Sequence, residues 1–147
     1  MKKIIIFLTI LLFTGCNSNY KTYNNYKKEL ENIKKSTKNI PFNIKIKNDR
    51  LSDNIIRYQM ELDNVKQDIT SVSAIIVHDK KTNDIFPTIG IFDEKINIYK
   101  NKKPKGLYLV GYIDSKEEIN NKNIEYKVLI KYKINNKSYK VYYVTKK

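Results

Sequence analysis

The feature that most constrains this fold is an alternation of apolar and polar residues that runs from Pro41 to the end of the sequence. It is clearest between Ile124 and Ile134, where every second residue is Ile, Tyr or Val. A period of two places these side chains on one face of a β-strand. Shorter runs of the same kind occupy residues 42–47, 56–62, 72–76, 85–91, 96–98, 107–113 and 139–143. The pattern predicts seven or eight strands.

Polar segments separate these runs and indicate where the chain turns. Asn135 and Asn136 predict a hairpin turn between the last two runs, because Asn tolerates positive φ. Pro87 indicates an edge strand or a bend within 85–91, and Gly111 indicates a bulge within 107–113. Strands of this number and spacing predict a mainly β protein, an antiparallel β-sandwich over residues 41–147. A lipocalin-like barrel and an open sheet packed on the N-terminal helix are the alternatives.

The pattern over roughly residues 42–145 resembles the immunoglobulin-like sandwiches of bacterial surface proteins. The resemblance is architectural, because the chain has no Trp and one Cys and therefore lacks the Cys…Trp…Cys signature of antibody domains.

A short helix is predicted before the strands. Tyr23, Tyr26, Leu30 and Ile33 follow one another at helical spacing. The helix could pack on the domain or form a stalk, or it could lie on a membrane with its lysines toward anionic headgroups. Residues 36–41 read as a linker, so residues 16–40 form a tether and helix ahead of the sandwich.

The first sixteen residues have the pattern of a targeting segment. Two lysines follow Met1, and the apolar run of residues 4–13 is too short to span a bilayer, which needs about 20 residues. Phe13-Thr14-Gly15-Cys16 resembles the lipobox of bacterial lipoproteins, with Phe13 in place of the usual Leu. The resemblance implies removal of residues 1–15, lipidation of Cys16 and anchoring on the exported side of a membrane. An ordinary secretory signal and a short transmembrane anchor are the alternatives.

The residue after Cys16 indicates which membrane would hold the lipid anchor. Asn17 stands where many inner-membrane lipoproteins have Asp, so the resemblance implies the outer membrane if the host has one.

The sequence offers little for catalysis. One Cys and one His exclude a disulfide framework, a thiolate zinc cluster and any site with two imidazoles. His78 lies beside Asp79 and near two serines on one run, whereas a catalytic triad needs groups aimed from separate loops. Glu117 and Glu118 are neighbours in one loop, and the loop 79–84 has lysines where a calcium site needs ligands. We therefore expect no enzyme, cofactor or metal.

Positive charge is concentrated in the C-terminal part. Residues 95–147 hold 14 lysines against 4 acidic residues, within a chain of net charge +14. Lys127, Lys131 and Lys133 share one face of their strand, and we expect Lys140 to join them across the hairpin. Further members of the candidate anion- or partner-binding surface are Lys102, Lys103 and Lys105 around Pro104, with Tyr108, Tyr112 and Tyr142 on outward strand faces. The alternative is a solvated outer face whose lysines discourage aggregation.

These observations predict a membrane-anchored envelope lipoprotein that acts as a non-enzymatic binding module. The expected partners are the membrane, through the lipid anchor, and another envelope or host protein or an anionic polymer. Nucleic acid is not expected, because an exported lipoprotein rarely meets it. The alternative function is a structural or assembly accessory of an envelope complex.

Overall fold

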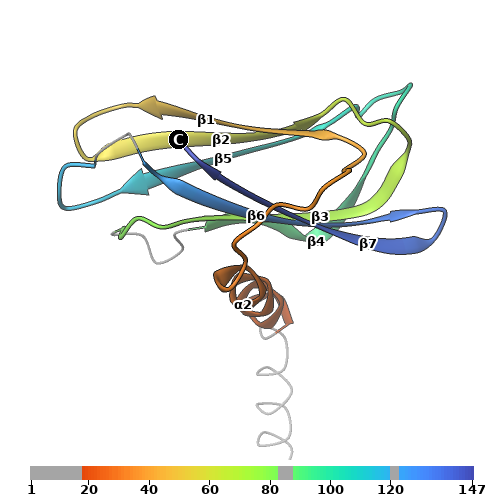
Figure 1. Cartoon of the computed structure of the whole chain (residues 1–147), viewed down its shortest axis with the longest axis horizontal. Coiled ribbons are helices and arrows are strands. Elements are labelled where there is room, and N and C mark those ends of the chain that lie inside the picture. Colours follow the sequence, from red (N-terminus) through yellow and green to blue (C-terminus); the bar gives the residue numbers. More distant parts are fainter. Residues whose placement is uncertain (1–17, 83–87, 120–122) are drawn as a thin grey trace, which may run out of the picture.

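Two antiparallel sheets face each other, and the helix α2 lies against the outside of one of them (Figure 1). The computed structural model describes residues 18–82, 88–119 and 123–147. Within these ranges the elements are α2 (Ser18–Glu31), β1 (Asn43–Arg50), β2 (Ile55–Asp63), β3 (Ile69–His78), β4 (Thr88–Ile98), β5 (Leu107–Asp114), β6 (Glu125–Ile134) and β7 (Lys137–Lys146). The predicted β-sandwich with a preceding short helix is confirmed.

The strand order is β1-β2-β5 in one sheet and β4-β3-β6-β7 in the other. The pairs β1-β2, β3-β4 and β6-β7 are antiparallel neighbours within a sheet, whereas the chain changes sheet between β2 and β3, β4 and β5, and β5 and β6. In constant-type immunoglobulin domains the fourth strand belongs to the sheet of the first, second and fifth strands. Here β4 pairs with β3 instead, which makes sheets of three and four strands.

The β6-β7 turn forms as the sequence predicts. Ile134 pairs with Lys137, and the two asparagines between them have φ values of 47° and 62°. A two-residue loop with positive φ at both positions matches the right-handed twist of the strands it joins.

Two details of the strands differ from the expectations. Residues 88–98 form one strand, β4, where the pattern predicted two, and Pro87 lies outside the described residues. The expected bulge at Gly111 is wrong, because the register with β2 runs unbroken through the pair of Gly111 and Tyr58. The glycine makes room for the tyrosine instead: a Cβ at Gly111 would lie 2.5 Å from Tyr58 Cζ. The irregularity lies in β3, where Ser71 has φ of 51° and the register shifts twice.

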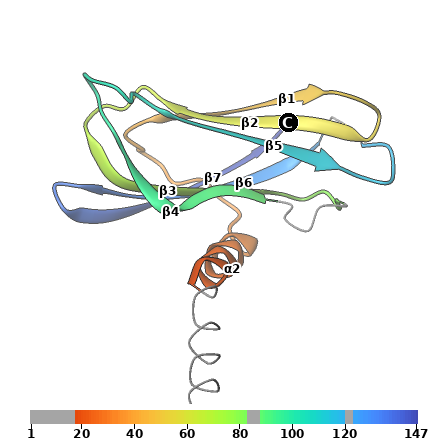
Figure 2. The ribbon, with the colours of Figure 1, turned by 180° about the vertical axis from the view of Figure 1, so that it is seen from behind.

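The main core lies between the two sheets. It is built from the alternate inward residues of each strand, such as Met60 and Leu62 of β2 and Val128 and Ile130 of β6, all fully buried. A second apolar cluster lies on the outer face of the four-stranded sheet. There Leu30 of α2 packs with Ile75, Leu129, Tyr23, Tyr26, Val77, Phe92 and Tyr142. The helix therefore uses its apolar stripe to cover this sheet, on the side away from β1, β2 and β5 (Figure 2).

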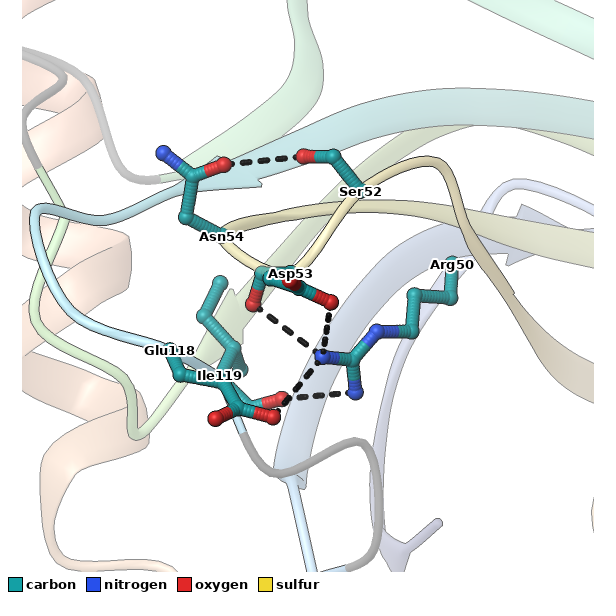
Figure 3. A network of polar contacts seen from close by, with 6 residues as sticks. All are labelled: Arg50, Ser52, Asp53, Asn54, Glu118 and Ile119. Carbon is teal, nitrogen blue, oxygen red and sulfur yellow. Dashed lines mark hydrogen bonds and ion pairs between the residues drawn. The ribbon is translucent and has the colours of Figure 1, made fainter.

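At one end of the sandwich, a single arginine joins two loops (Figure 3). The Arg50 guanidinium donates to the Asp53 carboxylate at 3.0 Å, to the Glu118 carboxylate at 3.1 Å and to the Ile119 carbonyl at 3.3 Å. The Ile119 amide in turn donates to the Asp53 carbonyl at 2.9 Å. These contacts tie the β1-β2 loop to the segment after β5, so Glu118 of the acidic pair has a structural partner.

Across the described ranges, no helix has the length and apolar character needed to cross a membrane.

Candidate anion-binding site

The outer face of the four-stranded sheet carries the lysines that the sequence analysis singled out on β6 and β7. Because Val128, Ile130 and Tyr132 point into the core, the residues between them, Lys131 among them, point outward. Lys131 lies directly opposite Lys140 of β7 in the register, as expected for two outward neighbours.

One carboxylate from the helix lies between these two lysines. Glu29 Oε2 is 3.0 Å from Lys131 Nζ, and Glu29 Oε1 is 2.8 Å from Lys140 Nζ. The Tyr142 hydroxyl also donates to Glu29 Oε1. The Lys131 ammonium makes a second contact, 3.7 Å from the centroid of the Tyr26 ring, which is a cation–π geometry. The helix is thus held to the basic face by charge as well as by its apolar stripe.

The surroundings of Glu29 change its acidity. Burial raises the pKa of the carboxyl, but the hydrogen bonds from Lys140, Tyr142 and Lys131 together outweigh burial and lower the pKa to about 2. In return, the hydrogen bond to Glu29 raises the pKa of Lys140 and of Tyr142. Glu29 is therefore ionised over the whole physiological range.

Beside this contact the surface is hollowed. A cavity of about 210 Å³ is lined by four lysines, three serines and three tyrosines: Lys95, Lys131, Lys133, Lys140, Ser71, Ser73, Ser138, Tyr26, Tyr132 and Tyr139. We call this set the basic hollow. Within residues 18–82, 88–119 and 123–147, Lys95 and Lys133 have no ion-pair partner. Four ammonium groups against the single contacting carboxylate of Glu29 leave a net charge of +3.

Two of the three serines of the hollow, Ser71 and Ser73, lie in the irregular part of β3, and the third, Ser138, lies on β7. A bulge turns a strand locally and re-aims its side chains. Ser71 has the left-handed conformation, and its amide donates a hydrogen bond to Asn97 Oδ1 at 3.0 Å. Ser73 follows, with its hydroxyl 3.1 Å from the Tyr26 hydroxyl. Ammonium and hydroxyl groups together are the donors that bind carboxylate or phosphate oxygens.

A comparison with protein-family models, curated proteins and solved structures finds no match to this chain. Because sandwich folds support many unrelated functions, the chemistry of this face carries the functional argument.

The structure brings only some of the predicted residues together. Lys131, Lys133 and Lys140 share the basic hollow. Lys127 lies apart, near the helix C-terminus, where its ammonium donates to the Glu31 carbonyl at 2.8 Å. A cation there stabilises the negative end of the helix dipole.

The loop lysines belong to a different part of the surface. Lys102 lies 4.3 Å from the centroid of the Tyr99 ring, Lys103 is exposed, and Lys105 lines a separate hollow that also contains Glu61 and Asp63. Lys105 therefore faces acidic neighbours and not the other predicted lysines.

The prediction of one basic face that also bears three tyrosines is wrong for two of them. Tyr108 and Tyr112 are half exposed on β5, in the other sheet. Tyr142 does belong to the basic face, but it lies under the helix and binds Glu29.

Sequence reasoning missed Glu29 and Lys95, and it assigned Tyr26 to the apolar stripe of the helix without a contact to a lysine. A usable signal exists for Glu29, which lies beside that stripe next to Leu30. A carboxylate next to an apolar stripe indicates a cationic partner on the surface that the stripe covers. Lys95 gave no signal, because it falls between two runs that were interpreted as separate strands.

A second cavity of about 340 Å³ lies near the helix C-terminus and is lined in part by His78. Its charged groups are balanced, with the carboxylates of Glu31, Asp79 and Glu125 against the ammoniums of Lys27, Lys80 and Lys127. This cavity therefore favours neither anionic nor cationic ligands. Over the part of the chain that the structure describes, no cluster of His, Cys, Asp and Glu side chains is arranged to hold a metal ion.

Proposed function

We propose that this chain is a lipid-anchored protein of the cell envelope that binds an anionic ligand without catalysis, through the basic hollow. The observation that carries the proposal is the composition of that hollow: four lysines and three serines, with one contacting carboxylate. Such a surface attracts anions and retains them by charge-assisted hydrogen bonds. An acidic segment of an envelope or host protein and an anionic envelope polymer both meet this requirement.

The anchor in this proposal is Cys16, supported by the resemblance of residues 13–16 to a lipobox. Two residues of extended chain span at most about 7 Å. Lipidation of Cys16 would therefore hold the start of α2, at Ser18, close to the lipid surface. Two or more acyl chains anchor a protein far more firmly than one.

The anchor is tested by metabolic labelling with a fatty-acid analogue. The parent chain should incorporate the label, and Cys16→Ser should not. Label retained by the variant would contradict the lipoprotein assignment.

Binding is tested with inorganic polyphosphate as the probe, using the lipidated chain in detergent micelles. Lys95→Glu/Lys133→Glu removes the two lysines of the hollow that lack ion pairs, so it should leave the fold intact. The matched control, Lys102→Glu/Lys103→Glu, makes the same change in net charge elsewhere. We expect the first pair to weaken binding by about tenfold or more and the control to weaken it by about twofold. Equal effects of both pairs would show that net charge, and not the hollow, attracts the probe.

A second candidate function, an accessory of an envelope complex, is favoured by the exposed apolar residues of β5. Tyr108, Val110 and Tyr112 are 56%, 40% and 51% exposed on the sheet away from the helix. Exposed aromatic residues are enriched at protein interfaces. An accessory should co-purify with a complex from the parent strain but not after Cys16→Ser, and Tyr108→Ser/Tyr112→Ser should release it.

A further inference from the structure

Strand β7 is an edge strand, and the described residues cover half of that edge. The linker after α2 runs beside the C-terminal half of β7. The Thr37 amide donates to the Tyr142 carbonyl at 2.7 Å, and the Tyr142 amide donates to Thr37 Oγ1 at 2.9 Å. The Val144 amide donates to Ser36 Oγ at 2.9 Å. Tyr142 and Val144 therefore direct their main-chain groups away from β6 and toward the linker.

The main-chain groups in the other half of the edge have the same direction, because amide and carbonyl groups alternate between the two sides of a β-strand. Residues two apart direct their amide and carbonyl groups to the same side of the strand. Ser138 and Lys140 therefore also direct these groups away from β6. Among the described residues, no main-chain or side-chain group pairs with the amides or carbonyls of these two residues on that side. Their edge is open, and it is two residues long before the linker begins.

The open edge lies at the basic hollow. Ser138, Tyr139 and Lys140 all line the hollow, together with Lys95 and Lys133. A ligand strand that pairs with this edge would place alternate side chains beside Ser138 and Lys140. Lys133, which has no ion-pair partner among the described residues, lies opposite Ser138 on the next strand, β6, so its ammonium group is one strand away from the ligand. The edge offers alternating donors and acceptors at the repeat of an extended polypeptide, which a polysaccharide or polyphosphate does not match.

We propose that the ligand of the basic hollow is an extended acidic polypeptide segment that adds to β7 as a short strand alongside Ser138 and Lys140. This inference rests on the proposed function and names the ligand class of the same site. The residues of the segment opposite Ser138 and Lys140 share the face of those side chains and are acidic. The residue between them lies on the face of Tyr139, whose exposed ring stacks on Tyr132, and is aromatic or apolar.

The test uses the lipidated chain in detergent micelles and the peptide acetyl-Glu-Tyr-Glu-Tyr-Glu-amide. Ser138→Pro removes the outward amide without removing a hydrogen bond to β6, and Ser138→Ala is the matched control that keeps this amide. We expect Ser138→Pro to bind the peptide about 3- to 10-fold more weakly than Ser138→Ala does, as for the loss of one hydrogen bond. Both variants lack the serine hydroxyl, so they should bind polyphosphate equally.

Hydrogen exchange on the unmodified protein gives a readout that does not depend on the proline variant folding. Peptide binding should slow exchange of the Ser138 and Lys140 amides, and a peptide N-methylated at alternate residues should not. A peptide that binds without protecting these amides would overturn strand addition. Binding of polyphosphate without binding of the peptide would assign the hollow to a non-peptide polymer; the proposed function would stand and this inference would fail.

Discussion

Glu29→Gln tests whether the charge of one carboxylate holds the helix to the sheet. Glutamine keeps the shape of the side chain and an acceptor for the Tyr142 hydroxyl, but it removes the charge that faces Lys131 and Lys140. A pKa lowered from 4.5 to about 2 corresponds to an upper limit of about 3 kcal/mol of folding free energy. Lys140 is half exposed, so solvent screens its pair, and partly exposed pairs contribute about 0.2–1 kcal/mol each. We expect a loss of about 1–2 kcal/mol.

The assay is urea unfolding of the chain from residue 16 with Cys16→Ser, which removes the proposed lipidation site. Glu31→Gln is the matched control, because its side chain is exposed and forms no ion pair among the described residues. At pH 7 the control should lose less than about 0.5 kcal/mol.

The pH dependence of the difference between parent and Glu29→Gln gives a second check. The folded-state pKa of Glu29 lies below its unfolded value, so the stabilisation is fully present above about pH 4.5 and is lost as the pH falls toward 2. The two proteins should therefore converge in stability over that window. Equal stability at pH 7, or a difference that stays constant down to pH 2.5, would refute the assignment of this stabilisation to the ionised carboxylate.

Three further predictions concern the sandwich itself, each measured by urea unfolding unless another method is named. Gly111→Ala should destabilise by about 1–3 kcal/mol, because the added methyl group overlaps the buried Tyr58 ring; a neutral result would show that the ring can move. Asn136→Gly should stabilise by up to about 1 kcal/mol, since glycine adopts the positive φ of that position without strain. Arg50→Gln should cost about 1 kcal/mol and should speed hydrogen exchange of the Ile119 amide, whereas unchanged exchange would show that the loops hold together without the guanidinium.

The fold was predictable because strand periodicity is a local property. Alternation over 42–47 or 56–62 reports which face of a strand is buried without any knowledge of its neighbours. The Asn135-Asn136 turn was predictable for the same reason, since its φ values depend on the two residues themselves. Gly111 was misinterpreted because its neighbour in space, Tyr58, is remote in sequence. A glycine in a strand indicates either a bulge or a close approach, and only the tertiary structure decides between them.

The candidate site was only partly predictable, because its parts come from distant segments. The lysines of β6 could be assigned to one face from their spacing. The pairing of Lys131 and Lys140 with Glu29 could not be predicted, since Lys140 and Glu29 are 111 residues apart. Charge clusters in sequence were a poor guide as well. Lys102, Lys103 and Lys105 are close together along the chain but lie outside the basic hollow, whereas Lys95 belongs to it.

The docking of α2 on β3, β4 and β6 also sets an order of events during folding. The helix is the first described element in chain order, but Lys140 and Tyr142, which bind its Glu29, lie on the last strand. Contacts across more than 100 residues form slowly, because a long loop must close before they stabilise anything. Folding chains should thus pass through a stage in which the helix is still free while the sandwich is assembling. The β6-β7 hairpin completes the surface on which the helix docks, and only then does the helix acquire its fixed position.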